Sequence, residues 1–223
     1  EIVRTKLSIC YFKLNRSREA VSVLLPANVE SEKERYLALE HLGGDYLNKS
    51  MLLHARYVFH YLNTFNAKAI TLVHEAVCVM MDDEHELVQE LLNRALKLEP
   101  DLLVAKYRLA QLAFRENDRE IAISFIDQCL DADPENLDYK LLKGYISEWQ
   151  YNFDDAKRFL WEVLNEAPDN RDAQYPLAYV SFTCCDWEEG FKRFESREIK
   201  YRHESELCRV LPSLIEWDGR EKI

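Results

Sequence analysis

Three short stretches with one shared pattern decide the fold of this chain: ALKLEPD at residues 95–101, CLDADPE at 129–135 and VLNEAPD at 163–169. Their prolines are evenly spaced along the sequence, at Pro100, Pro134 and Pro168. Each stretch carries apolar residues at helical spacing and then a proline, which cannot continue a helix. The spacing therefore predicts a unit that ends in a helix and repeats along the chain.

The same step recurs inside the predicted helices. Small residues recur in the first helix of each unit at Ala76, Ala110, Gly144 and Ala178, and small or medium ones in the second helix at Val88, Ala122, Ala156 and Gly190. Large apolar residues recur at Leu92, Ile126, Leu160 and Phe194. Small residues beside large ones are what two interlocking antiparallel helices require. We therefore predict an all-α fold of stacked helical pairs.

This pattern resembles the tetratricopeptide-repeat (TPR) family, in which 34-residue helix–turn–helix units stack into a right-handed superhelix. The resemblance implies an all-α TPR solenoid whose best units span residues 69–102, 103–136, 137–170 and 171–204. Because one unit cannot bury its apolar faces alone, stability is expected to come from stacking of neighbours.

Part of the N-terminal region fits the repeat less well. Residues 1–34 are in phase, but 35–68 place Gly43 and Gly44 inside an expected first helix. We therefore expect an irregular pair with helices at 31–42 and 45–63. The predicted organisation is a partly irregular N-terminal part at 1–68, four units at 69–204, and a capping or linker segment at 205–223.

The charge balance restricts the class of partner. The net charge is −11, and an acidic surface repels phosphate groups, so we expect no nucleic-acid and no membrane partner. The six cysteines show no paired CxxC spacing, which favours free thiols in a reducing cytoplasm. We interpret the adjacent Cys184 and Cys185 as core thiols, with a vicinal disulfide as the alternative.

No catalytic pattern is visible in the sequence. A phosphate-binding loop, an HExxH motif and a GxSxG elbow are all missing. The acidic run at 82–86 is expected at a helix start, where carboxylates favour the helix dipole, rather than at a metal. We therefore predict no catalytic residue, no cofactor and no metal in this chain, and no enzyme within it.

The resemblance implies a concave groove lined by the first helix of each pair. Counting helical faces from the small residues places an aromatic-rich set in this groove, with Glu148 beside it: Tyr107, Gln111, Phe114, Leu141, Tyr145, Trp149, Tyr175, Tyr179 and Phe182. Tyrosine and tryptophan are enriched at binding hot spots. We predict a peptide-binding groove that favours apolar or aromatic segments; the alternative is that these rings pack against neighbouring helices.

The C-terminal end carries a second resemblance. It is similar to the junction in bacterial proteins whose TPRs precede a glycosyltransferase-type domain, where Gly-aromatic-x-x-aromatic-Glu-x-Arg is followed by Trp-Asp-Gly. The matching residues are Gly190, Phe191, Phe194, Glu195, Arg197, Trp217, Asp218 and Gly219, with phenylalanine where that family more often has Trp and Tyr. The resemblance implies a catalytic domain downstream of Ile223.

Two functions follow as hypotheses. In the first, the chain is a protein-interaction module that recruits a protein partner or acceptor for a glycosyltransferase. In the second, it is a stand-alone scaffold or adaptor subunit of a multiprotein complex, which self-associates as a homodimer through its irregular N-terminal pair.

Overall fold

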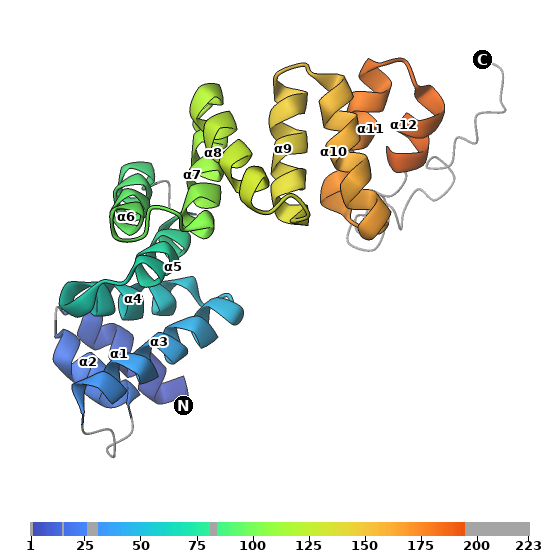
Figure 1. Cartoon of the computed structure of the whole chain (residues 1–223). Coiled ribbons are helices and arrows are strands. Elements are labelled where there is room, and N and C mark those ends of the chain that lie inside the picture. Colours follow the sequence, from blue (N-terminus) through green and yellow to red (C-terminus); the bar gives the residue numbers. More distant parts are fainter. Residues whose placement is uncertain (1, 15, 26–30, 81–83, 195–223) are drawn as a thin grey trace, which may run out of the picture. The chain divides into compact units, whose positions relative to one another are not determined.

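A computed structural model describes residues 2–14, 16–25, 31–80 and 84–194. Within these ranges the chain is entirely helical and has no strand (Figure 1). The helices are α1 (Ile2–Lys13), α2 (Ser17–Leu24), α3 (Glu32–Asn48), α4 (Leu52–Asn66), α5 (Ala69–Val79), α6 (His85–Leu98), α7 (Leu103–Arg115), α8 (Arg119–Ala132), α9 (Leu137–Trp149), α10 (Phe153–Glu166), α11 (Arg171–Thr183) and α12 (Trp187–Phe194).

Consecutive helices form six pairs, from α1–α2 to α11–α12, and the chain divides into two compact units at Ala132 and Asp133. In the first unit α4 packs on α5 and α6 packs on α7, and in the second unit α10 packs on α11. Each of the three repeat prolines lies just beyond a helix end, as predicted. Both units therefore have the predicted helical-repeat architecture of stacked helical pairs.

In the pairs from α5 to α10, the predicted small and large residues lie together in the core. Ala76 and Ala110 in the first helices are fully buried, and so are Leu92 and Ile126, each at position i+16 from its small residue. At Gly144 the contact is so close that an added Cβ would lie 2.9 Å from the side chain of Leu160, which is again at i+16. Close packing of this kind leaves no room for a larger first residue.

The prediction that Gly43 and Gly44 separate two helices is wrong. Helix α3 runs unbroken through both glycines to Asn48, and α4 begins at Leu52. Gly43 is buried, and a Cβ added there would lie 2.7 Å from Phe59 of α4, once more at i+16. The α3–α4 pair therefore has the same small–large contact as the others, displaced by one position from the phase of the later repeats.

One turn recurs between the helices of a pair. The second residue after the first helix has left-handed backbone geometry, with φ between 56° and 64°, at Ser50, Asn117, Tyr151 and Cys185. The next amide then donates to the carbonyl five residues back: Met51 to Tyr46 (2.8 Å), Asp118 to Ala113 (2.8 Å), Asn152 to Ser147 (2.9 Å) and Asp186 to Ser181 (2.9 Å). This is the Schellman ending, which usually has glycine at the left-handed position.

A buried polar network joins α4 to α5. Glu75 is 4% exposed on the buried face of α5. Its carboxylate accepts hydrogen bonds from the His60 Nδ1 (2.8 Å) and the Asn63 amide (2.7 Å), and Asn63 in turn accepts from the hydroxyl of the fully buried Thr71 (2.7 Å). The hydrogen bonds compensate the cost of burying a carboxylate.

The structure separates the cysteines into two groups. Cys78 and Cys129 are buried, and burial raises the pKa of the Cys129 thiol to about 11. The interpretation of Cys184 and Cys185 as core thiols is wrong, because both are exposed and free. They lie at the end of α11 and in the left-handed turn after it, beyond the buried face of the helix.

Replacement of Tyr151 by glycine should stabilise the chain. A left-handed conformation costs a non-glycine residue about 1 kcal/mol, and the Tyr151 side chain is 75% exposed, so little packing is lost. We expect the melting temperature to rise by about 2–4 °C. Asn117→Gly is the matched comparison and should gain less, since asparagine tolerates this conformation. Thermal unfolding followed by circular dichroism measures both changes, and a destabilised Tyr151→Gly would contradict the assignment of strain.

The hydrogen bond to Glu75 raises the pKa of His60 above its ordinary value. Protonated His60 therefore stabilises the folded chain, with the full effect below the unfolded-state pKa of about 6.5 and loss as pH rises through the higher folded-state pKa. The melting-temperature difference between the native chain and His60→Gln should be largest near pH 5.5 and shrink toward pH 8.5.

The control for this measurement is the Glu75→Gln background. There the His60→Gln substitution should give a difference that no longer depends on pH, because the carboxylate that holds the imidazolium is gone. A pH-independent difference in the native background would show that the His60–Glu75 contact does not couple to folding.

Candidate functional site

The predicted groove residues are divided between the two units. Tyr107, Gln111 and Phe114 lie on α7 in the first unit, where all three are partly exposed. The Arg108 guanidinium lies 5.6 Å from the centre of the Tyr107 ring and donates a 2.8 Å hydrogen bond to Gln111. Tyr107, Arg108 and Gln111 thus form a local polar and aromatic cluster on α7. The other six predicted residues lie on α9 and α11 in the second unit.

Tyr145 joins α9 to α11 through a backbone hydrogen bond. Pro176 lies inside α11 and has no N–H, so the carbonyl of Asp172, four residues earlier, loses its helical donor. The Tyr145 hydroxyl donates to this carbonyl at 2.6 Å. A proline inside a helix and a tyrosine on the neighbouring helix therefore compensate each other, and the hydrogen bond orients the Tyr145 ring.

A pocket of about 410 Å³ opens beside this hydrogen bond, and we call it the tyrosine pocket. Its walls come from α9 and α11, and its lining residues are Tyr145, Glu148, Arg171, Asp172, Tyr175, Pro176 and Tyr179. Tyr175 and Tyr179 are one helical turn apart and are 55% and 57% exposed. The volume falls within the range of about 300–1,000 Å³ that is usual for ligand pockets.

Glu148 gives the tyrosine pocket an acidic wall. Burial raises the pKa of its carboxyl, since water is partly excluded where it lies on α9. Asp172 and Arg171 also line the pocket, so its formal charge is −1 when all three are ionised. Burial makes the ionised form of Glu148 less stable, and a cationic group of a ligand placed beside it would compensate this loss.

Three further predicted residues lie outside this pocket. Leu141 packs against the apolar core of α10 and α11, and Trp149 is partly buried at the end of α9. Phe182 packs against α12, where a Cβ added to Gly190 would lie 2.5 Å from its ring, and where the rings of Phe191 and Phe194 lie 5.1 and 5.9 Å from it. Phe182 thus belongs to the contact within the last helical pair.

The same cluster accounts for part of the glycosyltransferase-junction motif. Gly190, Phe191 and Phe194 close the α11–α12 pair around Phe182, which is a packing role. The other motif residues, from Glu195 to Gly219, and the predicted capping segment at 205–223 lie outside the described residues.

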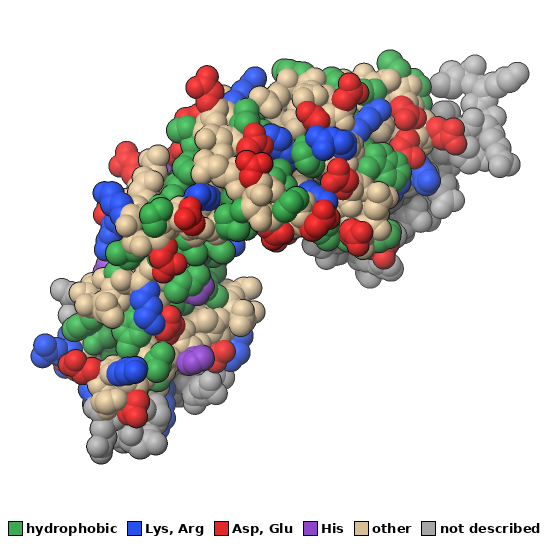
Figure 2. All heavy atoms as spheres, viewed as in Figure 1, with side chains coloured by type: hydrophobic (Ala, Val, Ile, Leu, Met, Phe, Trp, Pro, Cys, Tyr) green, Lys and Arg blue, Asp and Glu red, His purple; other side chains and the backbone are tan. Residues whose placement is uncertain are grey.

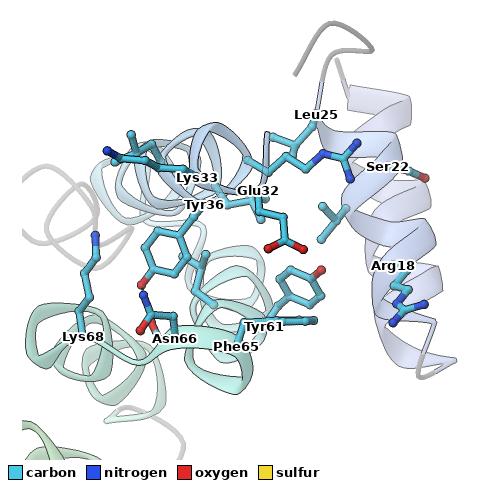
Figure 3. Close-up of a pocket in the computed structure, with 15 residues that line it drawn as sticks. Arg18, Ser22, Leu25, Glu32, Lys33, Tyr36, Tyr61, Phe65, Asn66 and Lys68 are labelled. Carbon is cyan, nitrogen blue, oxygen red and sulfur yellow. The ribbon is translucent and has the colours of Figure 1, made fainter. Parts of the chain in front are cut away.

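A second, larger pocket of about 1030 Å³ lies in the first unit, and sequence reasoning did not find it. Figure 3 shows it between α2 on one side and α3 and α4 on the other, with Tyr36, Tyr61 and Phe65 around the space. We call it the N-terminal pocket. No residue motif marks it, because it results from how α2 is placed rather than from a pattern in one helix.

The acidic side chains in the described ranges serve ion pairs within the chain. Among the described residues, no three His, Cys, Asp or Glu side chains come together as a metal site. Glu84, from the acidic run at 82–86, instead forms a two-armed ion pair with Arg56, both at 2.9 Å. Figure 2 shows acidic and basic side chains interspersed over the visible face. In the part of the chain that the structure describes, no helix is long and apolar enough to cross a membrane.

Comparisons with known proteins agree with the helical-repeat fold. Residues 103–136 match the family model described as tetratricopeptide repeat. These are also the bounds of one of the units predicted from the sequence. The search of the curated proteins gave no match.

Among solved structures, the chain is similar to MamA proteins. MamA from MSR-1 aligns with a TM-score of 0.58 at 17% identity, over 75% of this chain and 98% of that one. A MamA fragment from Desulfovibrio magneticus RS-1 aligns with a TM-score of 0.61 at 13% identity, over 76% of this chain and 97% of that one. MamA from AMB-1 aligns with a TM-score of 0.57 at 17% identity, over 80% and 99%. At such identities the likeness shows a shared fold.

Proposed function

We propose that this chain is a protein-interaction module whose tyrosine pocket binds an apolar or aromatic peptide segment of a partner that carries one lysine or arginine. The observation that carries the proposal is the pair Tyr175 and Tyr179, which leave more than half of their surface in water beside a formed pocket. Helical-repeat folds act by binding along such faces, and exposed tyrosines gain contact area with little loss of side-chain entropy.

The preference for a basic residue follows from the walls of the pocket. A lysine ammonium or arginine guanidinium could pair with the half-buried Glu148 while its stem packs on the tyrosine rings, whose faces attract cations. The net charge of −11 favours the approach of a basic partner. The proposal thus narrows the predicted apolar or aromatic ligand to one with a single positive group.

Selection of peptides from a displayed random library on the whole chain tests this function. The selected peptides should share an apolar or aromatic residue next to lysine or arginine. Their affinity, measured by titration calorimetry, should fall by at least about 30-fold in a Tyr175→Ser/Tyr179→Ser variant, since truncation of one hot-spot residue costs about 2 kcal/mol.

The control is Tyr151→Ser, which removes a tyrosine that is 75% exposed on the turn after α9 and does not line the pocket. Its affinity for the selected peptides should stay within about twofold of the native chain. Selected peptides that bind the double variant and the native chain equally would remove the tyrosine pocket from the function.

The setting of the module is also a proposal. On the resemblance of residues 190–219 alone, we infer that a glycosyltransferase-type domain follows the module and that the bound partner is its acceptor. The intact mass of the endogenous protein tests this: the inference requires a mass well above 26.4 kDa and peptides that continue past Ile223. An endogenous protein that ends near Ile223 would contradict it.

A stand-alone scaffold is the second candidate function. The N-terminal pocket favours it, since a chain with separate pockets in its two units offers two places for partners, one of which could be a second copy of the chain. We also propose a cytoplasmic setting, because the described cysteines are all free, and exposed thiols such as Cys10 persist where the surroundings are reducing.

A further inference from the structure

We propose that the N-terminal pocket, between α2, α3 and α4, binds an acidic amphipathic helix of a partner protein. The proposal begins with the stacking of the first unit. There α4 packs on α5 and α6 packs on α7, so the second helix of one pair lies against the first helix of the next. Helices α2 and α3 form no comparable contact within their described residues. The space that such a contact would fill is the pocket of about 1030 Å³.

The floor of this pocket is apolar and its edge exposes large apolar side chains. Val21, Leu39 and Leu62 are buried at its base, with exposures of 7%, 2% and 1%. Phe65 at its edge is 65% exposed and Leu37 is 43% exposed. Exposed apolar residues that adjoin a hollow of this size are typical of an interaction site.

Figure 3 shows how the rings are arranged around the hollow. Tyr61 and Phe65 come from α4, and Tyr36 comes from α3, with its hydroxyl donating to the Asn66 carbonyl at 2.8 Å. Tyr36 is thereby held in place, and the Lys68 ammonium lies 4.5 Å from its ring centre. The aromatic wall is therefore partly fixed before any ligand arrives, which lowers the entropic cost of binding.

The charges around the hollow are opposite to the charge of the chain as a whole. Four basic side chains line it, Arg18, Lys33, Arg35 and Lys68, against one acidic side chain, Glu32. The lining residues thus carry a formal charge of +3 in a chain whose net charge is −11, and it falls to +2 when the ion pair of Lys68 with Glu40 (2.8 Å) is included. Arg18 and Lys33 have no ion-pair partner within the described ranges. A ligand with carboxylates around an apolar face would complement this rim.

The place of the pocket in the stack selects a helix as the occupant. Because the pocket lies where one helix of a pair would normally contact the next pair, a helix that enters it would complete the interrupted stacking. An amphipathic helix binds in this way when its apolar face lies in a groove and its polar face meets the rim. The proposal does not rest on the tyrosine pocket, which lies in the other unit and has the opposite charge.

A pair of designed peptides tests the proposal on the whole chain. Each is a labelled helical peptide of about fifteen residues with leucine and phenylalanine on one face. The other face carries glutamate in one peptide and lysine in its counterpart. In fluorescence anisotropy, the glutamate peptide should bind at least about tenfold more tightly than the lysine peptide, and added salt should weaken it.

Two substitutions then locate the binding. Lys33→Glu should weaken binding of the glutamate peptide about fivefold, since it removes an attraction and adds a repulsion at the rim. Lys97→Glu makes the same charge change at an exposed lysine of α6 outside the pocket, and should have less than about a twofold effect. Phe65→Ser should weaken binding about tenfold while the exposed position leaves folding intact.

Several results would overturn the proposal. They are equal binding of both peptides, no binding of either, equal effects of the two lysine substitutions, or an unchanged affinity in Phe65→Ser. Loss of binding in the Tyr175→Ser/Tyr179→Ser variant would assign the peptide to the tyrosine pocket instead. A dimer in light scattering that Phe65→Ser dissociates would assign the N-terminal pocket to a second copy of the chain.

Discussion

The contact between a small residue of one helix and a large residue of its partner is the constraint on which the rest of the structure depends. A Cβ atom added at Gly43 or Gly144 would lie less than 3 Å from the side chain of its partner, Phe59 or Leu160. Because the helices approach so closely, these two pairs are fixed in rotation as well as in distance. The faces that remain, including those that form the tyrosine pocket, take their orientation from this contact.

The helical pairs from α5 onward could be predicted because their signals are local. Prolines end the second helices, and the small and large slots recur at one regular interval through Phe194. The α3–α4 pair could not be placed in this way. Its contact has the usual i, i+16 separation, but the step from Gly43 to Ala76 is one residue shorter than the step from Ala76 to Ala110, and this removes the pair from the phase of the later repeats. Glycine also has a low helix propensity, and the close contact of Gly43 with Phe59, which the sequence does not reveal, helps to hold α3 helical there.

The candidate site could be predicted in part. Helical faces alone lead to Tyr145, Tyr175 and Tyr179, which line one pocket. Helical faces do not reveal the role of Pro176. This proline leaves the Asp172 carbonyl without a helical donor, and the donor that replaces it, Tyr145, comes from another helix. Phe182 has the same spacing as the groove residues, yet its ring packs against Gly190 of α12, where the lack of a side chain leaves room for it. The N-terminal pocket has no sequence signal, since it depends on the packing of α2.

The fixed sequence separation within a pair has a consequence for recognising such chains. The repeat period slips by one position at α3–α4, but the separation of the small residue from its large partner stays the same there as in the later pairs. A match to the repeat model covers one unit, although the described residues hold six helical pairs. The helix–turn–helix, held together by one contact, is thus the constant element, while the links between pairs vary in length. A sequence search for a small and a large residue at this fixed separation would find helical-repeat chains with irregular repeat lengths, which a search for a constant repeat period misses.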